Sequence, residues 1–539
     1  MKKKCIALVC AAALALSLTA CGTVGQTGAA DTDTNTNAVQ AVGAEVSLEG
    51  ATTLTFTGSG VAASDGDYTG YEIDGTALTI DGAGTYILTG TCGNGSVTVK
   101  KGTTGVTLVL NGLDLTSADT APISCSKSTE VTIYAAPGSV NVLTDSAENN
   151  DESYPDNTEA ENAVIKCKDG SRVTLCGTGS LTVNANGKNG IKSGASTAEE
   201  GEASLTIREL ALTIDAPVND AVNAEQLLTI ESGTLTISAG DDALHCDLAL
   251  NIGADGTAGP TITMTDCCEG IEGATLNIYS GDIAINATDD CLNAANSDLS
   301  GYDFSINISG GTITAYTSGG DGFDSNGDLN ISGGTVAVWS ASSADNQPLD
   351  ADGAIRITGG TVLAAGGSGG MGMSLTAEQP CVLFSFGGSG GFGGNSGGSA
   401  LTKGSAFTIG SGSTAVYSGE ALCNAGFVFF SSSDLTADSS YDLAAGGSTL
   451  AAAAAQTGSV QTGMGGMDGQ PGQMPGGSFD PGSAPPRPAA RSGRETSSKD
   501  RRWTQNTTPH GASAVGCGVL WGEEDRKKAP SVIVVDMPA

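Results

Sequence analysis

Three ten-residue segments in the second half of the chain decide the fold: INISGGTITA at 306–315, LNISGGTVAV at 329–338 and IRITGGTVLA at 355–364. Each contains two short runs in which apolar and polar residues alternate, as they do in a strand with one buried face. The glycines between the runs permit a sharp bend with a left-handed backbone. Related segments at 228–237 and 276–285 show that the chain repeats a strand–bend–strand unit.

An acidic turn accompanies each unit. The spacings between successive turns are 22, 27, 21 and 31 residues, measured between Asp220, Asp242, Glu269, Asp290 and Asp321. Helical periodicity is absent, and three short strands per coil account for about 22 residues, so the longer spacings indicate loop insertions at a corner. The same rhythm occurs without acids at 122–125, 163–167 and 190–193. The sequence therefore predicts an all-β fold, a right-handed parallel β-helix over residues 50–365.

The N-terminal segment has the features of an export signal. Three lysines at 2–4 precede an apolar run at 6–18, which is too short to span a bilayer. The following Leu-Thr-Ala-Cys at 18–21 resembles the lipobox of bacterial lipoproteins. We expect a signal peptide at 1–20, lipid attachment at Cys21, a flexible tether at 21–49 and a place on the extracellular face of the cell membrane. The alternative is an ordinary signal peptide with an incidental cysteine.

Downstream of the repeats the composition changes three times. Residues 366–450 begin Gly-rich and return to strand-like patterns, which predicts a β cap over the open end of the coil. Residues 451–486 are rich in Ala, Gly, Met and Pro and are expected to be a low-complexity tail. Residues 487–539 carry 9 of the 23 Lys and Arg residues and no repeat. We interpret them as the product of a frameshift or a wrong gene end; the alternative is a genuine basic tail that binds the acidic wall.

Charge and cysteine placement restrict the partners. The formal net charge is −36, which argues against nucleic acid and favours divalent cations outside the cell. Of the 14 cysteines, Cys125, Cys167 and Cys246 occupy one position of the repeat, where a small apolar residue belongs. Export permits disulfides, but this placement favours buried thiols stacked inside the coil. We expect the protein to be a monomer.

The acidic turns suggest bound Ca²⁺. Equivalent residues of successive coils stack about 4.8 Å apart, so Asp220, Asp242, Glu269, Asp290 and Asp321 should form one column, and Asn223, His245, Glu272, Asn293 and Asp324 a second. So many carboxylates repel one another unless a cation lies between them, and Ca²⁺ prefers six to eight oxygen ligands. Zinc would need more His and Cys, and the chain has only two His. The candidate ligands are Asp220, Asn223, Asp241, Asp242, Glu269, Glu272, Asp289, Asp290, Asn293, Asp321, Asp324, Asp350 and Asp352. The alternative is a solvated edge, because Asp and Asn favour turns in any case.

Two aromatic residues suggest a sugar-binding surface. Tyr316 and Trp339 occupy the same column, 23 residues apart, on the outward side of the strand after Gly-Gly-Thr. Aromatic rings on adjacent coils would form a flat platform on which sugar rings could stack. The alternative is a pair of ordinary surface aromatics that shield an edge.

The succession of Ser-Gly-Gly-Thr strands, Gly-Asp-Asp-Ala-Leu-His at 240–245 and Gly-Asp-Gly-Phe-Asp-Ser-Asn-Gly at 320–327 resembles the clostridial carbohydrate-binding β-helix family. These are calcium-binding, polysaccharide-lyase-like surface lipoproteins, and the resemblance covers roughly residues 50–450. It implies binding of cellulose or acidic polysaccharides such as polygalacturonate. It also implies Ca²⁺ ligands at Asp220, Asp242, Glu269, Asp290, Asp321 and Asp324. His245 and the Glu269/Glu272 pair depart from simple Asp/Asn copies.

Three functions remain open from the sequence. The first is calcium-dependent polysaccharide binding at the cell surface, in which bound Ca²⁺ bridges protein and sugar carboxylates. The second is a polysaccharide lyase that uses Ca²⁺ and a lysine base, with Lys166, Lys188 and Lys192 as candidates; a lysine beside acids is more often an ion-pair partner. The third is a structural wall protein or adhesin without affinity for glycans.

Overall fold

The computed structural model describes residues 46–64, 69–341, 346–367, 372–386 and 401–462. These residues form 38 strands and no helix, which confirms the all-β prediction. Accordingly, no helix among them is long and apolar enough to cross a membrane. The predicted signal peptide, Cys21, nearly all of the 21–49 tether and the basic segment 487–539 lie outside the described residues.

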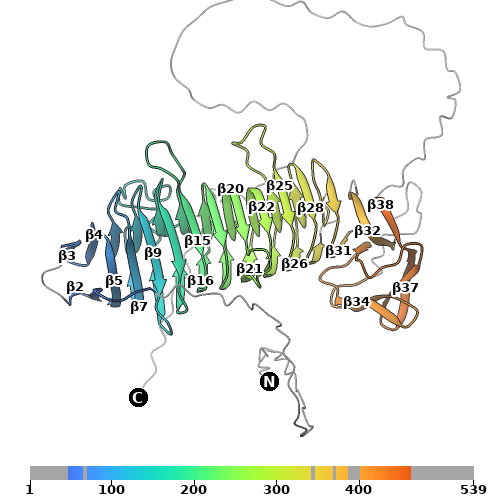
Figure 1. Cartoon of the computed structure of the whole chain (residues 1–539), viewed down its shortest axis with the longest axis horizontal. Coiled ribbons are helices and arrows are strands. Elements are labelled where there is room, and N and C mark those ends of the chain that lie inside the picture. Colours follow the sequence, from blue (N-terminus) through green and yellow to red (C-terminus); the bar gives the residue numbers. More distant parts are fainter. Residues whose placement is uncertain (1–45, 65–68, 342–345, 368–371, 387–400, 463–539) are drawn as a thin grey trace, which may run out of the picture. The chain divides into compact units, whose positions relative to one another are not determined.

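Most strands belong to three parallel ladders, in which each strand pairs with the equivalent strand of the next coil (Figure 1). The first ladder contains β4 (Ala77–Ile80), β6 (Ser96–Val99), β8 (Ile123–Cys125), β11 (Ala163–Cys167), β14 (Asn189–Ser193), β17 (Val222–Ala224), β24 (Leu292–Ala294) and β27 (Phe323–Ser325). The second contains β9 (Glu130–Ala135), β12 (Arg172–Cys176), β15 (Ser204–Ile207), β18 (Leu227–Ile230), β25 (Ser305–Ile308), β28 (Asp328–Ile331), β30 (Ile355–Ile357) and β32 (Ser374–Ser385). The third contains β10 (Val140–Thr144), β13 (Ser180–Asn184), β16 (Ala211–Ala216), β19 (Thr234–Ala239), β21 (Thr261–Cys267), β23 (Asp282–Ala287), β26 (Thr312–Thr317), β29 (Thr335–Ser340) and β31 (Thr361–Gly366).

Four longer strands take part in two ladders each. Strands β20 (Leu244–Ile252) and β22 (Ile271–Ile278) begin in the first ladder and end in the second. Strands β5 (Gly84–Cys92) and β7 (Val106–Thr116) run from the second ladder into the third. One coil therefore consists of a strand from each ladder in turn, which agrees with the three short strands per coil that the sequence predicted.

The core lies inside the stacked coils and consists of apolar columns. One column of the second ladder contains Leu205, Leu228, Leu250, Leu276, Ile306 and Leu329, which are paired residue by residue in register. Each of them is at most 1% exposed. The strict alternation of the sequence produces this arrangement, because a shift of one residue would turn every apolar side chain outward.

Glycines with positive φ stack at the bend of each Ser-Gly-Gly-Thr segment. Gly334 has a φ of +82°, and a Cβ there would stand 2.7 Å from the carbonyl oxygen of Gly311 on the preceding coil. We expect Gly334→Ala to lower the free energy of unfolding by about 1–3 kcal/mol, through left-handed backbone strain and this contact. Chemical denaturation would measure the loss. Gly412→Ala, where φ is also positive but no atom lies within 4 Å, is the matched control for the contact. Equal losses in the two variants would contradict the close stacking.

Antiparallel strands cover both ends of the ladders. At the N-terminal end, β1 (Thr52–Thr57) pairs with β2 (Gly60–Ala63), and β3 (Tyr71–Asp74) pairs with β4. At the C-terminal end, β35 (Phe427–Ser431) pairs antiparallel with both β31 and β32, and β38 (Gln456–Gln461) pairs with β32. A separate four-stranded sheet contains β33 (Ala406–Ser411), β34 (Thr414–Glu420), β36 (Ser440–Ala445) and β37 (Ser448–Ala454). Capping in this way removes the open edges that would otherwise pair with other chains.

The C-terminal boundary of the cap differs from the prediction. Residues 451–462, expected to begin the low-complexity tail, complete β37 and form β38. The Ala-rich stretch supplies β37, whose partner is the more buried β36. Segment 456–461 supplies backbone hydrogen bonds to β32, with only Val460 buried. Strand formation here depends on the pairing partner rather than on local propensity, which is why composition alone was misleading.

The prediction of buried thiols is confirmed. Nine described cysteines are free and buried, among them Cys125, Cys167 and Cys246. Cys125 and Cys167 are paired in register on adjacent coils, and Cys246 occupies the same column. These thiols fill the narrow core as small apolar side chains.

Candidate metal centre

The acidic turns stack in the two predicted columns. In the second column Asn223, His245, Glu272, Asn293 and Asp324 are paired in register from coil to coil. In the first column the carbonyl oxygens of Asp220, Asp242, Glu269, Asp290 and Asp321 each accept a hydrogen bond from an amide of the preceding coil. Gln347 continues this series, because its carbonyl oxygen accepts from the Gly322 amide at 2.8 Å.

Carboxylates of the first column also hold successive coils together. Asp242 donates its backbone N–H to Oδ1 of Asp220 at 3.3 Å, and Asp321 donates its own to Oδ1 of Asp290 at 2.6 Å. The Gln347 amide donates to Oδ1 of Asp321 in the same way. A turn acid thus has a structural role, because one of its carboxylate oxygens accepts a hydrogen bond from the backbone of the next coil. The second carboxylate oxygen remains for another partner.

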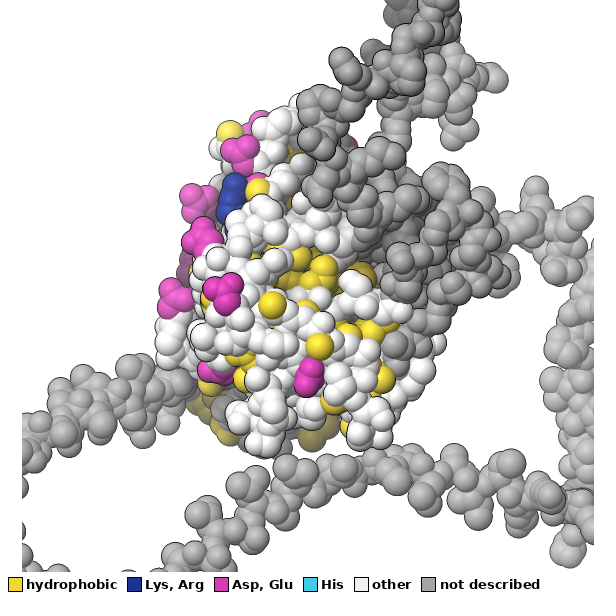
Figure 2. Space-filling view, turned by 90° about the vertical axis from the view of Figure 1, so that its right-hand side faces the viewer, with side chains coloured by type: hydrophobic (Ala, Val, Ile, Leu, Met, Phe, Trp, Pro, Cys, Tyr) yellow, Lys and Arg dark blue, Asp and Glu magenta, His cyan; other side chains and the backbone are white. Residues whose placement is uncertain are grey.

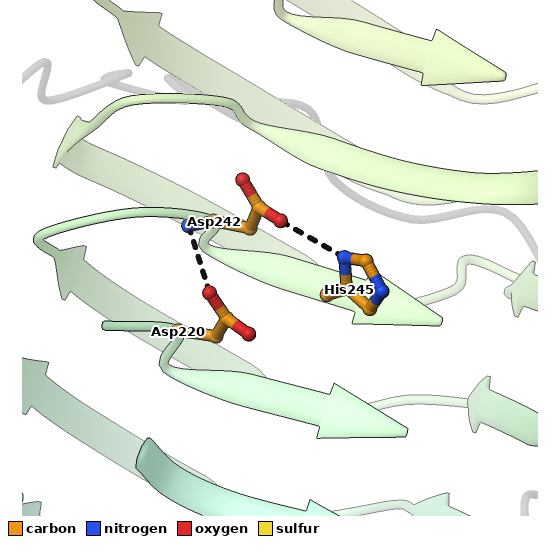
Figure 3. A group of neighbouring side chains, drawn as sticks. All are labelled: Asp220, Asp242 and His245. Atoms are coloured by element: carbon orange, nitrogen blue, oxygen red, sulfur yellow. Dashed lines mark hydrogen bonds and ion pairs between the residues drawn. The ribbon is translucent and has the colours of Figure 1, made fainter. Parts of the chain in front are cut away.

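At the N-terminal end of the columns, protein groups supply that partner. Asn223 donates its side-chain amide to Oδ2 of Asp220 at 2.6 Å, so both oxygens of this carboxylate are hydrogen-bonded. Figure 3 shows Asp220 and Asp242 on successive coils, with the ring of His245 directed at Asp242. The ligand atoms of these three residues lie within 4.8 Å of one another. Burial raises the pKa of Asp220 and raises that of Asp242 well above its usual range, so the hydrogen bonds offset the cost of burying these carboxylates only in part.

His245 neutralises the next coil. Its Nδ1 lies 2.9 Å from Asp242 and 2.7 Å from Glu272, and its Nε2 lies 2.9 Å from Asp247. Burial by itself would lower the pKa of His245, but the hydrogen bonds to these carboxylates raise the pKa well above its usual range. Burial would likewise raise the pKa of Glu272, yet the hydrogen bond from His245 leaves it lowered. The imidazolium thus holds a position that a cation would otherwise take, and both ring nitrogens are occupied by protons.

The following coil lacks such a cation and contains an unsatisfied acceptor. Burial, reinforced by Glu272, raises the pKa of Glu269 to about 8, and burial next to Glu269 raises the pKa of Asp290 to about 9. Asn293 donates its Nδ2 to Glu269 at 3.0 Å, and its buried Oδ1 has no hydrogen-bond partner among the described residues. A buried carbonyl oxygen without a donor is costly, and a hard cation would satisfy it.

The last two coils hold three carboxylates without a basic neighbour. The oxygens of Asp321, Asp324 and Asp350 lie within 4.8 Å of one another. Burial raises the pKa of Asp321 to about 7, and burial together with Asp350 raises the pKa of Asp324 to about 6. No lysine, arginine or histidine among the described residues forms an ion pair with any of these three carboxylates. An all-oxygen donor set of this kind fits Ca²⁺ rather than Zn²⁺.

The structure brings some of the predicted ligands together and leaves others apart. The structure brings together Asp220 and Asp242 with His245, then Asp242 with Glu269 and Glu272, and finally Asp321, Asp324 and Asp350. Asp241, Asp289, Asp290 and Asp352 belong to none of these three groups. Asp247 and Gln347 were not predicted. The His-x-Asp spacing at 245–247 was the only signal for Asp247, and Gln347 is revealed only by its place in the ladder.

The predicted aromatic platform does not hold. Tyr316 and Trp339 are paired in register as expected. However, Trp339 is only 2% exposed and packs edge-on against Phe407 of β33, with ring centroids 5.9 Å apart. Lys403 lies 4.8 Å from the ring centroid of Tyr316. Both rings point away from the coils, but residues of the C-terminal cap cover them. The repeat pattern predicts which residues are paired, and it does not predict what packs over them.

The candidate base lysines Lys188 and Lys192 lie far from the cluster of Asp321, Asp324 and Asp350. Lys188 pairs with Glu152 at 2.6 Å, and Lys192 pairs with Glu225 at 3.6 Å. Lys192 is separated from Asp324 by five steps of the second column, or about 24 Å at the usual strand spacing. A lysine at this distance cannot remove a proton from a sugar held by a cation at Asp324.

Acidic side chains gather on one side of the molecule where the C-terminal end is seen face on. Figure 2 shows most of the visible Asp and Glu along one edge, with mainly uncharged side chains over the remainder of the described surface. The surface at this end is therefore unevenly charged, and such a surface attracts cations.

Comparison with known proteins identifies the family. A family model described as "Carbohydrate-binding domain-containing protein" matches residues 74–370, which is more than half of the chain. The chain belongs to this family. The matched range contains the ladder strands from β4 to β31 and the whole of both columns; β32 of the second ladder lies beyond it.

Two relatives extend the comparison. A carbohydrate-binding domain-containing protein from Acetivibrio thermocellus is 37% identical over 123 residues, which are 23% of this chain and 42% of that protein. The chain thus matches about two fifths of the length of that curated relative. A solved structure, entitled "Structure of the polysaccharide lyase-like protein from C. thermocellum, Gadolinium derivative", is 25% identical with a TM-score of 0.36. The alignment covers 50% of this chain and 92% of that one.

Proposed function

We propose that this carbohydrate-binding domain protein binds acidic polysaccharide through Ca²⁺ held in the C-terminal part of the acidic columns. The observation that carries the proposal is the cluster of Asp321, Asp324 and Asp350, whose carboxylates have no basic partner among the described residues. The family match supports the polysaccharide as ligand. The proposal includes polygalacturonate as the first polymer to test and cellulose as the second.

Bound calcium reconciles the charge of the protein with that of its ligand. A chain of formal net charge −36 should repel a polyuronate. Ca²⁺ takes six to eight oxygen ligands, and three aspartates leave coordination positions for sugar carboxylates or hydroxyls. Two positions suit the ion: the Asp321–Asp324–Asp350 cluster, and the Glu269–Asp290 region in which the Oδ1 of Asn293 lacks a donor.

The remaining parts of the proposal concern form and location. We propose that the three parallel ladders wind as a right-handed parallel β-helix, and that the protein acts as a monomer. We also propose that lipid attached to Cys21 anchors it on the extracellular face of the membrane, which would present the acidic columns to wall or plant polysaccharides. The sequence around the lipobox is the support for this location.

Retention on immobilised polygalacturonate tests the function. We expect the full chain to be retained in 1 mM CaCl₂ and to be released by chelator. This calcium concentration is roughly a hundredfold above a dissociation constant of about 10 μM. The double variant Asp324→Asn/Asp350→Asn should lose retention at least tenfold, because the unpaired cluster loses two charges. Asp255→Asn, an exposed aspartate in a loop, is the matched control.

The outcomes separate the proposal from its rivals. Retention that is unchanged by chelator and by the double variant would contradict the calcium-dependent mechanism. Absence of retention on a panel of polymers, cellulose included, would favour a structural wall protein or adhesin. Absorbance from an unsaturated sugar product would indicate a lyase, whose base would then have to lie closer to the cluster than Lys192 does.

A further inference from the structure

A row of asparagines follows the outward face of the second ladder. Its members are partly exposed and are paired in register on successive coils from β20 to β28; they are Asn251, Asn277, Asn307 and Asn330. The Nδ2 of each donates to the Oδ1 of the asparagine before it, at 3.0 Å in the first step and 3.1 Å in the next two. These four residues, called the asparagine row below, join neighbouring coils and belong to neither acidic column.

The side-chain amides of the asparagine row have hydrogen-bonding capacity left over. Each amide offers two N–H donors and two acceptor lone pairs, and each step of the row uses one of either kind. Within the described part of the chain, Nδ2 of Asn251 has no acceptor and Oδ1 of Asn330 has no donor, so the row ends in a free donor and a free acceptor. Amides joined head to tail polarise one another, which strengthens the hydrogen bonds that the free groups can make.

The face around the asparagine row is uncharged. From β15 to β25, the outward positions of the second ladder hold only hydroxyl, amide and aliphatic side chains; they are Ser204, Thr206, Leu227, Thr229, Ala249, Asn251, Thr275, Asn277, Ser305 and Asn307. At the C-terminal end Asn330 is followed in register by Arg356, which pairs with Asp328 at 2.7 Å. In a chain of net charge −36, such a face favours a ligand without charge.

An exposed tyrosine borders the asparagine row. Tyr302 lies in the loop between β24 and β25 and is 38% exposed. Its hydroxyl lies 3.0 Å from Oγ1 of Thr275, two residues before Asn277 on β22, and its ring contacts that of Phe304 with centroids 5.3 Å apart. An aromatic ring beside amides suits a sugar, because the apolar face of the sugar can cover the ring while the sugar hydroxyls bond to the amides.

We propose that the asparagine row binds a neutral, extended glycan, a β-1,4-linked glucan chain that lies along the axis of the coils. Such a chain advances about 5 Å per sugar, close to the step of about 4.8 Å between coils, so each sugar meets one amide. Four amides therefore accommodate about four sugars. An α-1,4-linked glucan winds and loses this register. The inference goes beyond the proposed function, because it involves neither calcium nor the acidic columns.

Calorimetric titration of the full chain with cello-oligosaccharides, in buffer that contains chelator, tests the site. We expect the affinity to rise with length up to about four sugars and then to level off. Asn277→Thr should weaken cellotetraose about tenfold, because it interrupts the row and removes one amide. The backbone should accept threonine, which already occupies this column at 229. Tyr302→Ala should weaken cellotetraose about tenfold as well, through loss of the ring.

Two further variants sharpen the design. Thr229 pairs in register with Asn251, so Thr229→Asn would accept from the free Nδ2 of Asn251 and extend the row by one coil. The length at which affinity levels off should then move from about four sugars to about five, and such a gain requires a folded protein. Asn286→Thr replaces an exposed asparagine of the third ladder; it is the matched control and should change nothing.

Three outcomes would overturn the inference. The first is equal binding of maltotetraose, and the second is cellotetraose binding that is absent or unchanged in Asn277→Thr and Tyr302→Ala. The third is loss of cellotetraose binding in Asp324→Asn/Asp350→Asn, which would place the glucan at the acidic cluster. Retention on polygalacturonate in calcium remains the separate readout for the proposed function. If that retention fails while cellotetraose binds in chelator, the proposed function is wrong and the asparagine row stands.

Discussion

Addition of Ca²⁺ to the chelator-treated protein is expected to stabilise it strongly at pH 8–9 and only weakly near pH 5. At a free concentration about a hundredfold above the dissociation constant, each filled site contributes about 2.7 kcal/mol. A rise in melting temperature of roughly 5 °C or more should follow at the alkaline end. Because each coil contacts only its neighbours, as in a repeat protein, calcium should shift the unfolding transition of the C-terminal coils to higher temperature.

The pH dependence follows from carboxylates whose pKa values are raised in the folded protein. Burial raises the pKa of Asp324 to about 6, that of Asp321 to about 7 and that of Asp290 to about 9. For such groups, stability of the calcium-free protein is highest below the unfolded pKa of about 4 and is lost as the pH rises through the folded values. Calcium must displace these protons, so its affinity rises over the same range.

Calorimetric melts at pH 5, 7 and 9, with and without 1 mM CaCl₂, would measure this effect. MgCl₂ is the cation control, because Mg²⁺ demands a more rigid octahedral site and gives up its water less readily. The variant Asp324→Asn/Asp350→Asn should melt higher than the wild type without calcium and respond little to it, since it has lost the repulsion and the ligands together. Identical wild-type melts at pH 9 in the two buffers would refute the calcium sites.

Much of the fold could be predicted from the sequence because the repeat is local. The alternation of apolar residues determines which side chains face inward, and the turn acids mark equivalent positions in successive coils. The columns of Asp220 and Asn223 followed from counting alone. The cap could not be derived in this way. Strand β38 exists because β32 offers it an edge, and Trp339 is buried because β33 lies over it.

The hydrogen-bond partners of each candidate ligand could not be predicted from the sequence, for a different reason. Stacking shows which acids are neighbours, but the partner of each oxygen depends on side-chain directions across coils. Asn223 donates to Asp220 and the ring of His245 contacts Asp242, whereas no side chain in the described part of the chain hydrogen-bonds to Asp324 or Asp350. The columns therefore divide into an N-terminal part, in which Asn223 and His245 contact the carboxylates, and a C-terminal part, in which we propose that a cation takes their place.

Replacement of His245 by asparagine is expected to destabilise the calcium-free protein by about 3–5 kcal/mol at pH 8. The substitution removes the charge that bridges Asp242, Asp247 and Glu272 and leaves buried carboxylates uncompensated. Asparagine is the residue that Asn223 and Asn293 supply at this position of neighbouring coils, so the backbone should accept it. Because the folded pKa of His245 is raised, its contribution is complete below about pH 6.5 and persists well into the alkaline range.

Calcium should reverse much of this loss, since the variant exposes the same oxygen ligands that the C-terminal coils offer. Calorimetric titration is expected to show one more bound Ca²⁺ in His245→Asn than in the wild type, and melts at pH 8 should show a larger calcium response. At pH 5 the defect should shrink, because the freed carboxylates become protonated. His245→Lys, which keeps a positive charge, is the matched control and should bind no additional ion. If His245→Asn melts like the wild type without calcium and gains no ion, then the imidazolium does not stand in for a cation, and the division between the two halves of the columns must be abandoned.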